Sequence, residues 1–163
     1  MDDWDSRIAE AWAAFDAYEE ADFRALIDEL VAELPPDDPV GLYERGGAFD
    51  STGHPHEAVA LYREALDRGL AGGRRRQCVI QLASSLRNLG EARESVALLT
   101  AELDDGSDEL DGAVRAFLAL ALVDAGRERE AVSVALTALV PHLPRYQRSV
   151  SAYAQELVAG DEG

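Results

Sequence analysis

The chain has 163 residues, a formal net charge of −17 and a hydrophobic fraction of 47%. This composition predicts a folded domain and excludes disorder over most of the length. The acidic balance excludes nucleic-acid binding, because phosphate recognition requires clustered cations. The longest uninterrupted apolar run, residues 116–123, is much shorter than the ~20 residues that cross a bilayer, so no membrane segment is expected.

The N-terminus and the cysteine count both bear on the cellular compartment. The chain begins MDDWDSR, which is acidic where a secretory signal is basic, and its one cysteine, Cys78, cannot form an internal disulfide. Both features predict a cytoplasmic protein. Cys78 itself is expected to be a small buried side chain.

Apolar residues recur at helical spacing along the chain, and turn residues separate the runs. The pattern predicts nine helices, over residues 4–19, 22–34, 39–52, 55–68, 73–89, 92–104, 107–125, 128–142 and 145–159. Pro39 and Pro55 stand at the starts of the third and fourth helices, a position that suits proline. The first two helices have no glycine between them.

Three glycines, Gly53, Gly90 and Gly126, lie 37 and 36 residues apart and mark a repeat. Each follows a large apolar residue by four positions and a small residue by seven, and precedes another small residue by five. These sets are Phe49, Leu86 and Leu122; Gly46, Ala83 and Ala119; and Ala58, Ser95 and Ala131. A left-handed glycine ends one helix, and the small residues let the next helix approach closely. Each unit is therefore a helical hairpin that must stack on its neighbours.

This pattern resembles the tetratricopeptide repeat (TPR) family, in which W-x2-L-G-x2-Y is followed by A-x3-F. The second unit matches best, with Leu42, Arg45, Gly46, Phe49, Ala58, Tyr62 and Ala65. The period is longer than the usual 34 residues, and the excess falls in loops between units. The resemblance implies an all-α fold, namely a right-handed superhelical stack of about four TPR-like hairpins plus a C-terminal capping helix.

The resemblance also implies a single domain over residues 1–163. Its units are 4–34, 39–68, 73–104 and 107–142, and the capping helix is 145–159. In that helix Tyr146, Val150, Tyr153 and Leu157 share a face, which we expect to cover the apolar run 116–123, with Phe117 and Leu120. A homodimer, in which the last helix docks on a second copy, is the alternative.

TPR arrays bind along a concave face lined by the first helix of each hairpin. The resemblance thus implies a protein-protein interaction module or scaffold with a protein or peptide partner. The residues expected to contact that partner are Tyr43, Glu44, Gln77, Gln81, Ser84, Arg87 and Asn88. The lysine and asparagine clamp of chaperone-binding TPRs is absent, so we do not predict binding of chaperone tails.

The alternative function is a small-molecule or metal-dependent enzyme or sensor that uses the groove. His54 and His56 lie on a turn and His142 is two units away, so these histidines do not supply the converging ligands of a zinc site. The acidic run 104–112 fails as a calcium loop, because the closing acid would fall at Leu118, a core position. It is interpreted as a loop whose Asp and Ser residues cap the next helix. No catalytic, cofactor-binding or metal-binding residue is expected.

Arg74, Arg75 and Arg76 form a basic cluster at the start of the fifth helix, where cations oppose the helix dipole. Two interpretations stay open. Acid-rich neighbouring loops offset these charges, or an acidic ligand or partner tail binds them.

Overall fold

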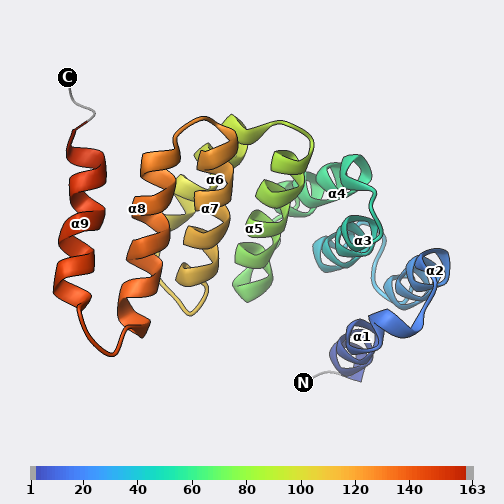
Figure 1. Cartoon of the computed structure of the whole chain (residues 1–163). Coiled ribbons are helices and arrows are strands. Elements are labelled where there is room, and N and C mark those ends of the chain that lie inside the picture. The colour runs from blue at the N-terminus through green and yellow to red at the C-terminus, as the bar shows by residue number, and fades with distance from the viewer. Residues whose placement is uncertain (1–2, 161–163) are drawn as a thin grey trace. The chain divides into compact units, whose positions relative to one another are not determined.

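The computed structural model describes residues 3–160, and within this range it is all-α (Figure 1). Its elements are α1 (Asp3–Ala13), the 3-10 turn η1 (Phe15–Ala17), α2 (Glu20–Val31), α3 (Pro39–Ser51), α4 (Pro55–Asp67), α5 (Gly72–Asn88), α6 (Ala92–Asp104), α7 (Asp111–Asp124), α8 (Glu128–Leu139), the 3-10 turn η2 (Val140–His142) and α9 (Gln147–Ala159). The predicted class, an all-α helical repeat stack, is confirmed. No helix in the described range is long and apolar enough to cross a bilayer.

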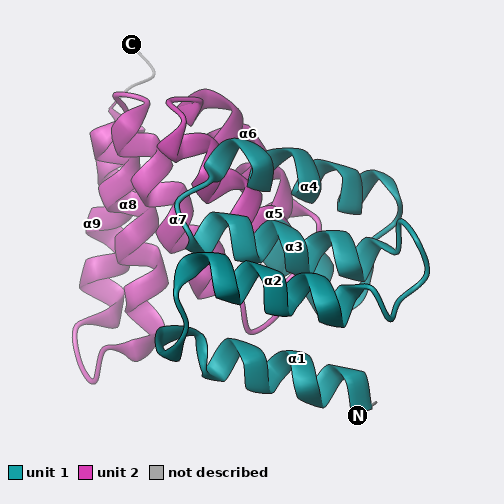
Figure 2. Ribbon diagram, turned by 90° about the vertical axis from the view of Figure 1, so that its right-hand side faces the viewer, with its two compact units in different colours: residues 1–78 teal, residues 79–163 magenta. Residues whose placement is uncertain are grey.

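The chain divides into two compact units, unit 1 (Met1–Cys78) and unit 2 (Val79–Gly163), and the boundary falls within α5 (Figure 2). Unit 1 holds α1 to α4 and the start of α5. Unit 2 holds the rest of α5 and the helices α6 to α9.

The turn glycines end the first helix of each hairpin as the repeat pattern predicts. Gly53 has a φ of 78°, in the left-handed region that favours glycine. The amide of His54 then donates to the carbonyl of Phe49 at 2.9 Å, and the amide of Gly53 to that of Asp50 at 3.2 Å. These two bonds satisfy carbonyls that the end of α3 leaves without helical partners. Gly90 and Gly126 end α5 and α7 with the same conformation and the same bond pattern.

The small residues bring the two helices of a hairpin together, also as predicted. A Cβ atom on Gly46 of α3 would lie 2.7 Å from the ring of Tyr62 of α4, so the ring packs directly on the α3 backbone. In the next hairpin, Ser95 of α6 takes the place of the usual alanine. Its hydroxyl donates to the carbonyl of Ala83 at 2.7 Å, which satisfies a polar group that is otherwise buried.

The first hairpin differs from the prediction, because α1 ends at Ala13 and not at residue 19. A 3-10 turn follows and brings Phe15 against Phe23 of α2, with ring centroids 4.8 Å apart. Trp12 packs on the same Phe23 ring at 5.0 Å. A continuous helix would keep these aromatic rings apart, so tertiary packing overrides the local helical spacing.

The seventh helix also starts later than predicted, at Asp111 and not at residue 107. The hydroxyl of Ser107 donates to the Asp111 carboxylate at 2.6 Å, and the Leu110 amide donates to the Asp108 carboxylate at 2.7 Å. These side chains close a turn ahead of α7. They do not cap it as predicted, since the N-cap residue, Leu110, makes no side-chain cap.

The last helix packs on α8, as Figure 1 shows. Ala154 is 1% exposed there, and its carbonyl accepts a hydrogen bond from the Ser133 hydroxyl at 2.7 Å. The face that packs contains Val150, Ala154 and Leu157, at i, i+4 and i+7.

Two expectations about α9 are therefore wrong. Tyr146 and Tyr153 are 75% and 62% exposed, because Tyr146 precedes the helix in a left-handed conformation and Tyr153 lies to one side of the packed face. Leu120 is 48% exposed, so α9 does not cover it.

Candidate partner-binding faces

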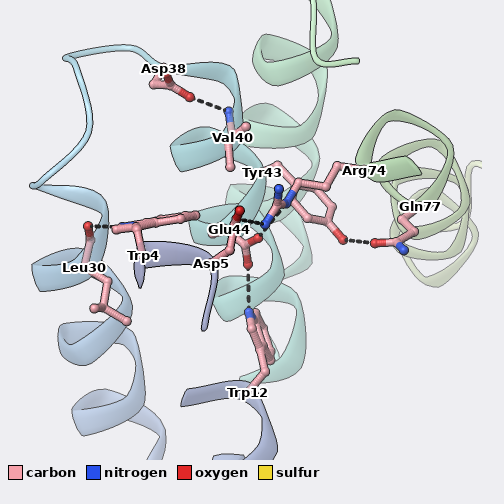
Figure 3. A network of polar contacts seen from close by, with 10 residues as sticks. All are labelled: Trp4, Asp5, Trp12, Leu30, Asp38, Val40, Tyr43, Glu44, Arg74 and Gln77. Atoms are coloured by element: carbon pink, nitrogen blue, oxygen red, sulfur yellow. Dashed lines mark hydrogen bonds and ion pairs between the residues drawn. The ribbon is translucent and has the colours of Figure 1, made fainter. Parts of the chain in front are cut away.

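The seven residues predicted to contact a partner lie on α3 and α5, the first helices of two successive hairpins. The structure groups them by unit. Tyr43, Glu44 and Gln77 belong to unit 1, and Gln81, Ser84, Arg87 and Asn88 belong to unit 2. Each group is described by itself below. The helix start that positions the first group is set by Asp38, whose side chain accepts the Val40 amide at 2.9 Å beside Pro39 (Figure 3).

Glu44 is the centre of a polar network that joins three first helices in unit 1 (Figure 3). Its carboxylate accepts a hydrogen bond from Trp12 Nε1 of α1 at 2.7 Å. Its other oxygen lies 3.4 Å from Nε of Arg74, at the start of α5. Arg74 in turn bonds the Asp5 carboxylate of α1 at 2.8 Å. Glu44 is only 5% exposed, and burial raises its pKa against the opposing effects of Trp12 and Arg74.

This network also identifies the carboxylates that offset the positive charge of Arg74. The carboxylates that pair with it come from helices α1 and α3, and not from neighbouring loops as the first interpretation supposed. The second interpretation, that an acidic ligand or partner tail binds the cluster, stays untested.

The indole of Trp12 covers the adjacent turn of α3. A Cβ atom on Gly47 would lie 3.0 Å from this ring, so the ring rests on the backbone at a position where a larger side chain would interfere. Trp12 and Arg74 together cover the side of α3 that carries Glu44 and Gly47. This side is the first-helix face of unit 1. The sequence did not single out Trp12 and Asp5 for this face.

Tyr43 and Gln77 form a second contact between α3 and α5. The Tyr43 hydroxyl donates to Gln77 Oε1 at 3.0 Å (Figure 3). Tyr43 is 8% exposed, whereas Gln77 is exposed to solvent. The buried Tyr43 hydroxyl therefore fixes the orientation of the exposed Gln77 amide.

In unit 2 one of the predicted residues, Arg87, contacts α7. Arg87 donates to the Asp124 carboxylate at 2.9 Å and to the Asn88 side-chain oxygen at 3.3 Å. Gln81 and Ser84 are half-buried and Asn88 is exposed. On α7, Leu120 and Val123 are 48% and 49% exposed. The apolar run of α7 concealed this feature in the sequence, since its residues are apolar on every side of the helix.

A cavity of about 240 Å³ lies at the Asp124 end of α7. Its lining comprises residues 90–93 from the turn before α6 and the first turn of that helix, and Asp124 and Ala125 from the end of α7. Two carboxylates, those of Glu91 and Asp124, belong to this lining, together with one guanidinium, that of Arg93.

The histidine and cysteine candidates of the sequence lie outside both faces. His54 Nδ1 is 3.4 Å from the Thr52 hydroxyl, at the turn after α3. Within residues 3–160 no group of three His, Cys, Asp or Glu side chains is arranged to hold a metal ion. Cys78 is fully buried as predicted, and burial raises its pKa to about 12.

The family model for the tetratricopeptide repeat matches residues 39–157, and the chain belongs to this family. The match ends at residue 157, within α9, so it extends beyond the fourth hairpin. Helical repeats of this kind serve as scaffolds that bind other proteins. No curated protein matches the chain significantly in sequence.

Three solved structures share the fold. MamA (residues 41 to the end) from Desulfovibrio magneticus RS-1 is 15% identical, with a TM-score of 0.64 over 100% of this chain and 99% of its own. An ArsTM double mutant of MamA RS-1 is 13% identical, with a TM-score of 0.62 over 100% and 99%. YrrB, described as a TPR protein with an unusual peptide-binding site, is 15% identical, with a TM-score of 0.55 over 95% and 86%.

Proposed function

We propose that this chain is a cytoplasmic scaffold that binds a peptide or partner surface through the first helices of its hairpins. In this proposal it catalyses no reaction, needs no cofactor and binds neither nucleic acid nor a membrane. The observation that carries the proposal is the exposure of Leu120 and Val123, at 48% and 49%, on the first helix α7. Exposed apolar groups that adjoin polar side chains are typical of protein-binding surfaces.

The polar residues of the two faces divide into two roles. Gln77 and Asn88 are exposed and present amides, which both donate and accept hydrogen bonds, to the backbone of a peptide. Gln81 and Ser84 adjoin them at half-buried positions. Tyr43, Glu44 and Arg87 are held by contacts within the chain and orient their neighbours.

The relatives support the same function. YrrB, which shares the fold, is described as having a peptide-binding site. We propose by analogy that the present chain takes a peptide on the concave face that TPR arrays form. The alternative, an enzyme or sensor, has no observation in its favour among residues 3–160.

Selection from a random peptide library displayed on phage, against the intact chain, tests this function. The affinity of the selected peptides is then measured for three first-helix variants, Gln77→Ala, Gln81→Ala and Asn88→Ala. Matched controls are Thr100→Ala and Glu128→Ala, at exposed positions on the second helices α6 and α8. We expect at least one first-helix variant to lose about tenfold, or ~1.4 kcal/mol, and the controls to lose nothing. Selected peptides that bind all five variants equally, or a selection without binders, would contradict the proposal.

A further inference from the structure

We propose that the partner binds in unit 2, along a strip formed by Ser84 and Arg87 of α5 and Leu120 and Val123 of α7. We further propose that it is a peptide segment with aliphatic side chains and a basic residue. This inference rests on the proposed function and deepens it, because it names the part of the first-helix face that is free and the chemistry that fits it.

The first-helix face of unit 1 is already occupied by its own chain. Trp12 bonds Glu44 and rests on Gly47, and Arg74 reaches across α3 to Asp5. A peptide that bound there would have to displace the Trp12 indole and leave the buried Glu44 carboxylate without its donor. Loss of a buried hydrogen bond to a charged group is costly, so unit 1 disfavours a peptide.

The corresponding positions of unit 2 are all at least partly exposed. Each first helix carries two residues at equivalent positions of the repeat. These pairs are Glu44 and Gly47 of α3, Gln81 and Ser84 of α5, and Phe117 and Leu120 of α7. Ser84 and Phe117 are half-buried, and Leu120 is 48% exposed. In unit 1 the Trp12 ring covers Gly47. In unit 2 the equivalent residue of α7, Leu120, is partly exposed to solvent.

The open surface of α7 is apolar. Ala116, Leu120 and Val123 are all exposed and follow the i, i+4, i+7 spacing of one helix face. The Arg87–Asp124 ion pair joins this face to α5 at its end. Aliphatic side chains of a bound segment would remove Leu120 and Val123 from water, which supplies a driving force of ~25 cal/mol for each Å² of apolar surface buried.

The basic residue proposed for the partner is inferred from the charges around the strip. Glu91 and Asp124 contribute carboxylates to the cavity of about 240 Å³ at the end of the strip. The cavity also adjoins the C-terminus of α7, where the helix dipole favours a cation. Arg93 opposes a cation there and Arg87 already pairs with Asp124. The net charge of −17 nevertheless attracts a basic segment from a distance.

The same charge argues against a second copy of this chain as the occupant. Two copies would each carry −17, and their mutual repulsion opposes association unless specific contacts outweigh it. A separate partner with lysine or arginine beside its aliphatic residues meets no such repulsion. We therefore assign the strip to a basic, aliphatic peptide and treat self-association as an outcome of the test.

The test uses the intact chain and peptides selected from the random phage-displayed library. We expect the selected sequences to combine aliphatic residues with lysine or arginine. Leu120→Asp should weaken their binding at least tenfold, whereas Val132→Asp, at an equally exposed apolar position of α8, should leave it unchanged. Aspartate at position 120 adds a charge that attracts a basic peptide, so a loss must come from the apolar contact. Leu120→Ser repeats the test without a new charge.

Two further variants separate the remaining outcomes. Glu91→Gln should weaken basic peptides and reduce the salt dependence of their binding, and Thr100→Ala, at an exposed position of the second helix α6, should have no effect. Acidic selected peptides, or binding that Leu120→Asp and Leu120→Ser leave intact while Gln77→Ala weakens it, would overturn this inference and leave the proposed function standing. A full-length dimer that Leu120→Asp dissociates in sedimentation would overturn it in favour of a second copy. Melting temperatures near that of the parent chain establish that the variants are folded.

Discussion

Gly46 of α3 and Tyr62 of α4 are in such close contact that a Cβ atom on the glycine would lie 2.7 Å from two carbons of the tyrosine ring. Tyr62 is fully buried, so its ring has no free space into which to move. The second hairpin therefore requires a residue without a side chain at position 46. This requirement is tertiary, since an isolated helix would favour alanine over glycine.

Gly46→Ala should consequently lower the free energy of unfolding by ~1–3 kcal/mol, as overpacking does, and Gly46→Leu by more. Gly112→Ala is the matched control, because a Cβ atom on Gly112 of α7 meets nothing within 4 Å. It should raise the free energy of unfolding by up to ~1 kcal/mol through helix propensity alone. Urea denaturation measures both values. Equal effects of the two substitutions would show that the Gly46–Tyr62 contact is not limiting.

Glu44 should make stability depend on pH in a direction opposite to that of a surface carboxylate. Burial raises its pKa, although Trp12 and Arg74 oppose the shift and the Asp5 carboxylate adds to it. The folded state then keeps the proton to higher pH than the unfolded state, whose glutamate titrates near ~4.3. The contribution of Glu44 to the free energy of unfolding therefore falls as the pH rises from that value through the raised folded pKa.

Glu44→Gln removes this titration and keeps an acceptor for the Trp12 indole. The difference in unfolding free energy, parent minus variant, should fall as the pH rises from mildly acidic to neutral. Urea titrations at several pH values measure it. A difference that grows with pH would mean that Trp12 and Arg74 stabilise the carboxylate more than burial penalises it.

Ala154 should be the most sensitive alanine of α9. It is 1% exposed against α8, and a larger side chain there has to push the two helices apart. Ala154→Leu should lower the free energy of unfolding by ~1–3 kcal/mol, whereas Ala152→Leu, at an exposed position of the same helix, should stay within ~0.5 kcal/mol of the parent chain. Equal melting temperatures for the two variants would remove Ala154 from the α8–α9 contact.

Cys78 should report on the opening of α5. Its thiol is fully buried, lies 3.6 Å from the Tyr62 carbonyl and has its pKa raised to about 12. Only the thiolate reacts readily with disulfide reagents, so labelling of the folded chain should be limited by structural opening. Stopped-flow labelling should be slow in buffer and accelerate strongly with urea. A labelling rate in buffer equal to that of the unfolded chain would contradict the burial of this thiol.

The sequence predicts the features of the fold that depend on local chemistry. Gly53 ends α3 because a left-handed residue is needed there, and the small residue at Gly46 follows from the repeat pattern. It does not predict where α1 ends, because the turn at Phe15 depends on contact with Phe23 in another helix. The start of α7 was missed for a local reason, since the Ser107–Asp111 hydrogen bond competes with helix formation.

The candidate partner-binding faces, too, are predicted from the sequence only where they depend on local repeat positions. The repeat spacing identifies the positions of the first helices, such as Glu44 and Ser84, that point away from their own hairpin. It does not reveal that Trp12 and Arg74 cover Glu44, because Arg74 pairs with Asp5 across 69 positions of sequence. The exposure of Leu120 was likewise hidden, since it depends on where α9 docks.

Chemical-shift mapping of a selected peptide on the isotope-labelled intact chain tests whether a partner binds the first helices. We expect the largest amide shifts on the C-terminal half of α5 and on α7, around Ser84, Leu120 and Val123, with little change on α6 and α8. Shifts concentrated on the second helices α4, α6 and α8 would contradict binding through the first helices.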